Sequence, residues 1–396
     1  MLELADIFRE AGADYRRAFA SRMLPSHLKA MRDIEACRTP ALGGHLRSCD
    51  NHCGALQYSY HSCRNRHCPK CHTDQTRRWL EAQKTRLLPC PYFLLTFTLP
   101  AQLRPLARSH QKRLYPALLS TSARSVLSLA TDARYLGARP GLITVLHTWT
   151  RAMIYHPHAH ILTTGGGLAP DGDRWVDPVH HDFLLPGRAL SKMFRGKFRA
   201  ALEKTGLIAE APPAVWHKPW VVHLQQAGSG EKVLEYLSRY LFRIAIANSR
   251  LERFENGAVT FRYRDNRSGQ IKHCTLPAQE FISRFLQHVL PPRLTKVRYH
   301  GIYSPSRNKD LERARGLLAP PRAPLLTDPP VPDERAPLAP DVPVEKDAVQ
   351  LREDPLCPSC KIGRMRIVAI LPRQRDPPRS AERPRGEACS SYWMPS

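Results

Sequence analysis

Apolar side chains return every three or four positions over residues 1–36, a spacing that predicts helices. Pro25 divides this stretch into two segments, because proline removes a helical hydrogen-bond donor. The same period returns further along the chain and predicts helices over residues 75–88, 104–136, 188–205, 231–246 and 278–289. Residues 104–136 form either one helix or two.

Runs of β-branched and aromatic residues lie between these helical segments and predict strands. The clearest run covers residues 92–99 and ends at Pro100. Residues 259–263 and 271–276 flank a polar, glycine-containing turn and therefore predict a hairpin. Further strands are expected over residues 142–149, 158–163, 220–225 and 295–299.

The pattern breaks down in two places, which suggests how the chain is divided. Residues 37–74 are rich in Cys and His and poor in periodic apolar positions, as in small domains held together by metal. After Leu318 prolines crowd together and no period survives, so residues 319–355 are interpreted as a disordered linker. We therefore predict a helical and zinc-binding domain over 1–88, a catalytic domain over 89–318 and a Pro-rich disordered tail over 319–396.

The net charge of +25 over 396 residues indicates that the protein binds a polyanion, and nucleic acid is the first candidate for that partner. A solvated basic surface with no specific partner is the alternative. No run of eighteen apolar residues is present, and the first residues do not resemble a signal peptide. We therefore expect a cytoplasmic protein, associated with the bacterial nucleoid and not with a membrane.

Most of the eleven cysteines cluster with histidines, which favours metal binding over disulfides. Cys49-x₃-Cys53 and Cys68-x₂-Cys71 together predict one structural, four-thiolate Zn²⁺ site. A second site remains open, and free thiols are the alternative to both. The pair Cys357-x₂-Cys360 lacks a partner pair, so that no metal is predicted there. The candidate ligands of a second zinc are Cys37, His45, Cys63 and His67.

The sequence His156-Pro-His-Ala-His160 provides a different kind of metal site. In a strand, His158 and His160 share one face because side chains alternate. His147 on the preceding strand is the first candidate for a third ligand, since an antiparallel pairing would place it beside His158. Such a site keeps open positions, as a catalytic metal needs, and would use Mg²⁺ or Mn²⁺. A surface cluster or a structural zinc site is the alternative.

Two tyrosines near residue 240 add a candidate nucleophile. Tyr236 and Tyr240 lie four residues apart on a predicted helix, so they share one face, flanked by Arg239 and Arg243. Tyrosines that only cover the edge of a core are the alternative. A metal ion that makes a phosphate more electrophilic, together with nearby arginines, would let a phenol attack it and form a phosphotyrosine ester.

The paired motifs resemble those of the two-tyrosine branch of HUH single-strand endonucleases, and within it rolling-circle insertion-sequence transposases. The resemblance covers about residues 30–318, including the Cys/His region. It implies a ferredoxin-like antiparallel sheet within an α+β fold, with the histidines on a central strand and the tyrosines on a facing helix. It also implies nicking and rejoining of single-stranded DNA at element ends and target through a 5′-phosphotyrosine, and a zinc domain that docks on element ends. The candidate DNA-binding residues are Arg64, Arg66, Lys70, Arg195 and Lys197.

Two other functions fit the same residues. A plasmid or phage replication initiator would use the same chemistry, and a zinc-finger protein would bind DNA without cutting it. The sequence does not determine the oligomeric state, the target preference or which tyrosine attacks first.

Overall fold

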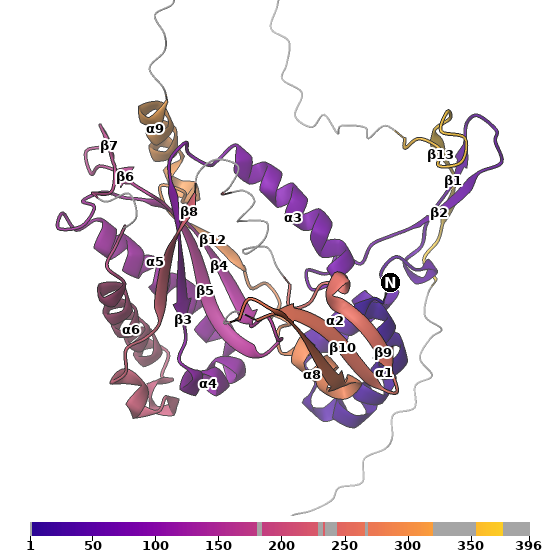
Figure 1. The fold of residues 1–396 in the computed structure, drawn as a ribbon, viewed down its shortest axis with the longest axis horizontal. Coiled ribbons are helices and arrows are strands. Elements are labelled where there is room, and N and C mark those ends of the chain that lie inside the picture. Colours follow the sequence, from indigo (N-terminus) through magenta and orange to yellow (C-terminus); the bar gives the residue numbers. More distant parts are fainter. Residues whose placement is uncertain are drawn as a thin grey trace, which may run out of the picture. The chain divides into compact units, whose positions relative to one another are not determined.

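The computed structural model describes residues 2–179, 184–228, 233, 244–265, 268–319 and 354–374. Contacts divide the chain into two units, the first built from residues 1–35 and 63–347 and the second from residues 36–62 and 348–396 (Figure 1). Each unit combines segments that are distant in sequence. This division differs from the predicted one, in which the boundaries followed the chain in order.

A five-stranded antiparallel sheet forms the centre of the first unit, in the order β12-β4-β5-β3-β8. The histidine-bearing strand β5 is its middle strand, and β4 and β3 pair with it on either side. This arrangement confirms the α+β class with an antiparallel sheet and the central position of the histidines. The strands are β3 (Tyr92–Thr98), β4 (Gly141–Trp149), β5 (Tyr155–Thr164), β8 (Val222–Gly228) and β12 (Val297–Gly301).

One face of this sheet is covered by α5 and α6, which Figure 1 shows on the same side. Phe194 and Phe198 recur at helical spacing on α6 and enter the main core, where the Phe194 ring lies 5.1 Å from that of Phe97. No described helix combines the length and apolar character needed to cross a membrane. The helices are α4 (Arg104–Ser109), α5 (Gln111–Ala130) and α6 (Gly187–Lys204).

The opposite face is apolar towards one end of the strands and polar towards the other. Leu94, Val145 and Leu162 pack there with Leu311 of α9 (Asn308–Leu318). Helix α3 (Pro69–Lys84) also belongs to this side, because its Trp79 indole donates a hydrogen bond of 3.0 Å to the Tyr299 hydroxyl. The short strands β6 (Gly167–Leu168) and β7 (Trp175–Val176) form a separate pair. The histidines occupy the polar end of this face.

A second layer of the first unit combines the chain's first helices with a three-stranded sheet. Phe8 of α1 and Phe285 of α8 meet edge to face, with ring centroids 5.5 Å apart. Residues 1–35 therefore pack with residues from 251 to 286, which the predicted domain over 1–88 did not foresee. The elements are α1 (Leu4–Phe19), α2 (Pro25–Ala36), β9 (Leu251–Glu255), β10 (Ala258–Arg264), β11 (Ile271–Pro277) and α8 (Ala278–Leu286).

The second unit is a small sheet in the order β13-β1-β2. Strand β13 (Met365–Leu371) pairs antiparallel with β1 (Gly44–Cys49), which also pairs with β2 (Leu56–Tyr60). Residues 354–374 thus form a turn and a strand, and the prediction of disorder across 319–396 is wrong for this segment. The 3₁₀ turns of both units are η1 (Ala20–Arg22), η2 (Pro40–Leu42), η3 (Ala101–Leu103), η4 (Ile208–Glu210), η5 (Pro213–Trp216), η7 (Asn248–Arg250) and η8 (Pro305–Arg307).

Candidate active site

Three histidines converge at the polar end of the central sheet. The register of β4 and β5 pairs His147 with His158, the neighbour expected from the sequence. The Nε2 atoms of His158 and His160 lie 3.1 Å apart, and the candidate ligand atoms of all three lie within 4.8 Å of one another. Ala159, between the two strand histidines, is fully buried in the core on the other face.

Hydrogen bonds orient the two strand histidines. His158 Nδ1 donates to the backbone carbonyl of His156 at 2.7 Å, which leaves its Nε2 lone pair directed towards His160. His160 Nδ1 lies 2.9 Å from the hydroxyl of Thr96, the residue opposite it on β3. Burial lowers the pKa of His158 to about 4 and that of His160 well below its usual value. Both imidazoles are therefore neutral at physiological pH, the form that binds metals.

This donor set fits a divalent metal ion. Two imidazole nitrogens 3.1 Å apart can both reach one ion at the usual ~2.1 Å for nitrogen ligands. Metal-binding histidines usually have such outer contacts on the second ring nitrogen. The His156 carbonyl fixes the tautomer of His158, because it can only accept, and the Thr96 hydroxyl orients the ring of His160. Three protein ligands on one side leave coordination positions open, as catalytic metals need.

A cavity of about 350 Å³ opens beside the histidines. Its lining includes Arg151 and Arg250 together with Ile244. His156 also lines it and accepts a hydrogen bond of 2.7 Å from the Arg104 guanidinium. Several cations around an open metal-type site are suited to hold a phosphate.

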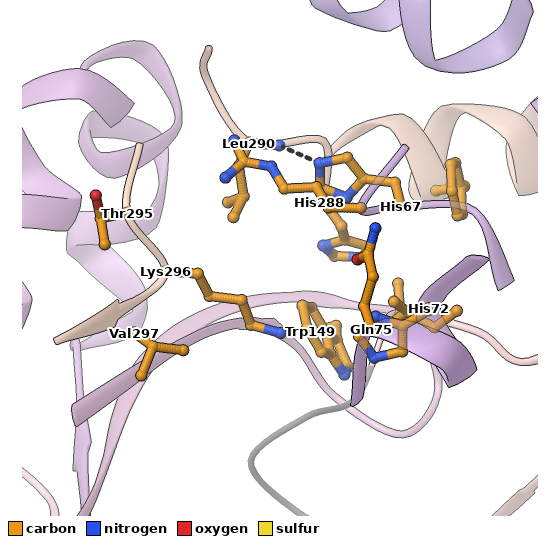
Figure 2. A pocket seen from close by; sticks show the side chains of 13 residues that line it. His67, His72, Gln75, Trp149, His288, Leu290, Thr295, Lys296 and Val297 are labelled. Atoms are coloured by element: carbon orange, nitrogen blue, oxygen red, sulfur yellow. Dashed lines mark hydrogen bonds between the residues drawn. The ribbon is translucent and has the colours of Figure 1, made fainter. Parts of the chain in front are cut away.

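Figure 2 shows side chains that line a second cavity, of about 210 Å³. Trp149 and Ile244 line both cavities. Figure 2 shows Lys296 reaching towards Trp149, and its ammonium lies 5.2 Å from the centre of the indole ring. Burial, with the charge of Arg66, lowers the pKa of Lys296 to about 7. Trp149 also stacks on His147, with ring centroids 4.7 Å apart. Trp149 thus lines both cavities and packs against a candidate metal ligand.

The segment that carries the two tyrosines, residues 234–243, lies outside the described residues. Below it is called the tyrosine segment, and it contains Tyr236, Tyr240, Arg239 and Arg243. The residues that follow it are held at the histidine cavity. Ile244 lines the cavity, and the Arg250 guanidinium donates to the carbonyls of Ala245, at 3.3 Å, and of Arg151. Arg151 belongs to the turn between the two histidine strands, so Arg250 ties the end of the tyrosine segment to that turn.

Comparison with known proteins places this chain in a family. A family model described as "Putative transposase" matches residues 141–310, and one described as "Transposase zinc-binding domain" matches residues 7–99. The chain is 37% identical over 398 residues to "Putative transposase y4qJ" of Sinorhizobium fredii, covering 95% of this chain and 97% of that protein. It is 33% identical over 299 residues to "Transposase for insertion sequence element IS801" of Pseudomonas savastanoi pv. phaseolicola, covering 68% and 70%.

The chain belongs to the IS91/IS801 family of insertion-sequence transposases. No solved structure matches it. Membership confirms the family resemblance given by the His and Tyr motifs, and it means that the protein acts on DNA.

The cysteines of the transposase are grouped differently from the prediction. Cys63, Cys68 and Cys71 lie together in the first unit, with the Cys63 and Cys71 sulfurs 3.5 Å apart. Cys49 and Cys53 instead lie with the C-terminal pair in the second unit. The predicted site of Cys49, Cys53, Cys68 and Cys71 is therefore wrong in its pairing, although the thiol clusters fit structural zinc. Cys37, directly after α2, stays a predicted ligand.

Neither of the two predicted zinc-ligating histidines belongs to a metal-type group in the described part of the chain. His67 Nε2 accepts a hydrogen bond of 3.2 Å from the backbone N–H of Leu290. The His45 ring lies edge-on to that of His61, with centroids 4.8 Å apart. Both imidazoles are used in packing, and the prediction that they bind zinc is corrected.

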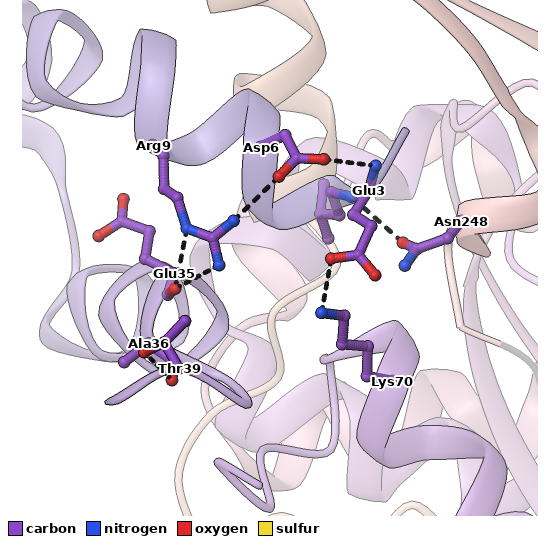
Figure 3. Close-up of polar contacts among 9 residues, drawn as sticks. Glu3, Asp6, Arg9, Glu35, Ala36, Thr39, Lys70 and Asn248 are labelled. Atoms are coloured by element: carbon purple, nitrogen blue, oxygen red, sulfur yellow. Dashed lines mark hydrogen bonds and ion pairs between the residues drawn. The ribbon is translucent and has the colours of Figure 1, made fainter. Parts of the chain in front are cut away.

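Two of the predicted DNA-binding cations are engaged inside the first unit. Figure 3 shows Lys70 at Glu3, with an ion pair of 2.6 Å beside the start of α1. Arg66 donates to the carbonyls of Leu294 and Pro291 at 2.6 and 2.7 Å. These contacts give Arg66 and Lys70 a role in holding the unit together. Arg64 is exposed, whereas Arg195 and Lys197 are half-exposed on α6.

Sequence reasoning missed the polar residues that support the histidines. Thr96, Arg104 and Arg250 each contact the histidine cavity or its turn, but none belongs to a motif. One signal was available for Thr96. In the run of residues 92–99, threonines replace apolar residues at 96 and 98 on one face, which indicates a polar neighbour at that end.

Proposed function

We propose that this transposase cuts and rejoins single-stranded DNA through a covalent 5′-phosphotyrosine intermediate. One observation carries the proposal, namely the convergence of His147, His158 and His160 on a cation-lined cavity at which the tyrosine segment ends. A metal-binding site for the phosphate and a nucleophile for the attack are the two parts that such a reaction needs.

The three histidines would hold Mg²⁺ or Mn²⁺ through Nε2 of His158 and His160 and a ring nitrogen of His147. When bound, the ion neutralises charge on the scissile phosphate and makes its phosphorus more electrophilic. The carbonyl of His156 keeps His158 in the metal-binding tautomer, and the Thr96 hydroxyl holds the orientation of the His160 ring. The protein side of the site thus binds and orients the phosphate.

In the nicking step, the phenol oxygen of Tyr236 or Tyr240 forms a bond to phosphorus and loses its proton. The bond from phosphorus to the 3′ oxygen breaks, and that oxygen takes up a proton to become a hydroxyl. Arg239 and Arg243, with Arg151 at the cavity, would stabilise the extra negative charge of the transition state. Because the ester retains the bond energy, attack by another 3′-hydroxyl rejoins the strand.

Chain connectivity supports the participation of the tyrosines. Tyr240 precedes Ile244 by four residues, so their Cα atoms are separated by no more than ~15 Å in any conformation. Ile244 lines the histidine cavity, and the anchored carbonyl of Ala245 limits how far the segment can move away. Tyr240 is thus the nearer of the two along the chain, and Tyr236 lies one predicted helical turn before it.

A basic groove on the first unit supports binding of a single strand. Arg188, Lys192 and Arg195 of α6 line a shallow hollow of about 670 Å³ beside Trp220. The spacing of these cations along one helix face suits successive phosphates. We propose this groove as a path for the DNA, with Arg195 among its contacts. Lys197 does not line the groove and stays a separate predicted contact on α6.

A nicking assay tests the proposal. The full chain is incubated with a single-stranded oligonucleotide that carries the element end, with Mn²⁺ or Mg²⁺, and products are separated under denaturing conditions. We expect a covalent protein–DNA adduct that Tyr236→Phe, Tyr240→Phe or the double variant diminishes or abolishes. Tyr263→Phe, on the three-stranded sheet of the same unit, is the matched control and should behave as wild type.

The outcomes separate the alternative functions. DNA binding without any adduct would show a zinc-finger binder and refute the catalytic proposal. Adduct formation without joining to a target strand would show an initiator-type enzyme, and joining of the element end to a second oligonucleotide is expected for a transposase.

A further inference from the structure

Four thiols from the two ends of the chain meet in the second unit. Cys49 is the last residue of β1 and Cys53 follows it, whereas Cys357 and Cys360 precede β13. The sulfurs of Cys49 and Cys360 lie 3.7 Å apart, and those of Cys53 and Cys357 lie 3.6 Å apart. Four sulfurs at ~2.3 Å from one Zn²⁺ ion define a tetrahedron with edges of ~3.8 Å. All four cysteines are free thiols, and their sulfurs lie within 4.8 Å of one another.

The backbone around the C-terminal pair has the tight turn that such a knuckle needs. The Cys357 N–H donates to the Gly363 carbonyl at 2.7 Å, and the Lys361 N–H donates to the Cys357 carbonyl at 3.0 Å. Lys361 takes a positive φ of 58° to close the turn. The Gly363 N–H then points at the Cys360 sulfur, 3.4 Å away, as a donor to a thiolate does.

The N-terminal pair sits against this turn and is fastened to it. Asp50, next to Cys49, accepts from the Arg364 N–H at 2.7 Å and from the Arg366 guanidinium at 3.0 Å. A Cβ on Gly363 would lie 2.6 Å from the Cys49 sulfur, so only glycine allows the two knuckles to approach this closely. The two segments, although Cys53 and Cys357 are 304 positions apart in sequence, therefore have complementary backbone conformations.

The described part of the second unit has a small buried core beneath its three-stranded sheet. Its buried cluster in the described residues is formed by Cys49, Cys357 and Met365, with Ala55 and Cys360 packed against it. Units with such a small core usually need a metal or disulfides to fold. The zinc-binding family model ends at residue 99, so it does not include the C-terminal pair.

We propose that Cys49, Cys53, Cys357 and Cys360 bind one structural Zn²⁺ ion, which joins the N-terminal hairpin to the C-terminal strand as a single folded unit. The C-terminal pair is then half of a zinc site and the tail is part of the zinc-binding module. Four protein ligands leave no open position, so this ion has a structural role. The proposal is independent of the catalytic one.

Metal content of single-cysteine variants tests the site. Full-length protein is dialysed against metal-free buffer under reducing conditions, and zinc per chain is measured by mass spectrometry. We expect Cys357→Ser, Cys49→Ser and the double variant each to lose the same single ion. Cys274→Ser, which removes a half-buried thiol on β11, should retain the wild-type zinc content. If Cys49→Ser lost an ion and Cys357→Ser kept it, the proposal would be wrong.

Alkylation of the wild-type protein gives an answer even if a variant fails to fold. Cys53 is exposed, so only a bound metal would protect it from iodoacetamide. We expect peptides with Cys53, Cys357 and Cys360 to be protected together and to become reactive at the same chelator concentration. Cys274 should react at the same rate throughout. Reaction of Cys357 and Cys360 in the zinc-loaded protein, while Cys49 and Cys53 stay protected, would overturn the proposal.

Discussion

Replacing Thr96 by valine tests the proposed metal site at its support without removing a ligand. The Thr96 hydroxyl lies 2.9 Å from His160 Nδ1, and valine keeps the shape of the side chain while removing this contact. Loss of an outer hydrogen bond of this kind weakens metal binding by about 10- to 100-fold. That range corresponds to about 1.4 to 2.7 kcal/mol of binding free energy.

The assay is a Mn²⁺ titration, read by isothermal calorimetry and by nicking of a single-stranded oligonucleotide. We expect Thr96→Val to need about 10- to 100-fold more Mn²⁺ for half-saturation, and to recover near wild-type nicking at high Mn²⁺. Thr98→Val is the matched control, because Thr98 lies two residues further on the same strand, is also half-buried and is paired with His158. Equal half-saturation for the two variants would refute the assigned role of Thr96.

Three further predictions concern residues outside the histidine site. Arg250→Ala should lower adduct formation at least ~10-fold with unchanged zinc content, because it removes the link between Ala245 and the turn that joins the two histidine strands. The control Arg253→Ala, at an exposed residue, should leave adduct formation unchanged. Equal adduct formation by the two variants would contradict the anchoring role of Arg250. Burial lowers the pKa of His288 to about 4, so between pH 6.5 and 4 the unfolded chain binds a proton here that the folded chain does not. The free energy of unfolding should therefore fall over this range, by up to about 3 kcal/mol from this residue. The melting temperature of His288→Gln should fall less steeply with decreasing pH, and the same pH dependence as in the wild type would contradict this. Gly363→Ala should prevent zinc binding in the second unit, because the added Cβ would lie against the Cys49 sulfur. The expected readout is faster alkylation of Cys53. If Cys53 stayed protected, the close approach of Gly363 to Cys49 would not be required.

The part of the site that follows from strand periodicity could be predicted. His158 and His160 share a face because side chains alternate, and His147 joins them because a short turn fixes the register of β4 and β5. The hairpin of β10 and β11 was predicted for the same reason, since its strands and turn are local in sequence. These features depend on neighbours within a few tens of residues.

The ligand pairing of the cysteines could not be predicted, because it depends on a contact between opposite ends of the chain. Proximity in sequence favoured Cys68 and Cys71 as partners of Cys49 and Cys53. In the second unit Cys49 and Cys53 instead lie with Cys357 and Cys360. That pair follows a long proline-rich stretch, so the segment that forms β13 was included in a predicted disordered tail. The packing of α1 on α8 was missed for the same reason, since an amphipathic pattern indicates a buried face but not its partner.

Anomalous diffraction from crystals of the full chain, soaked in Mn²⁺ with a bound element-end single strand, would locate the metal, the phosphate and the nucleophile together. We expect a Mn²⁺ peak shared by the ring nitrogens of His147, His158 and His160, with a scissile phosphate bound to it and a phenol of Tyr236 or Tyr240 in contact with that phosphate. A metal bound elsewhere, or an ion at the histidines with both phenols remote from the phosphate, would contradict the proposed mechanism.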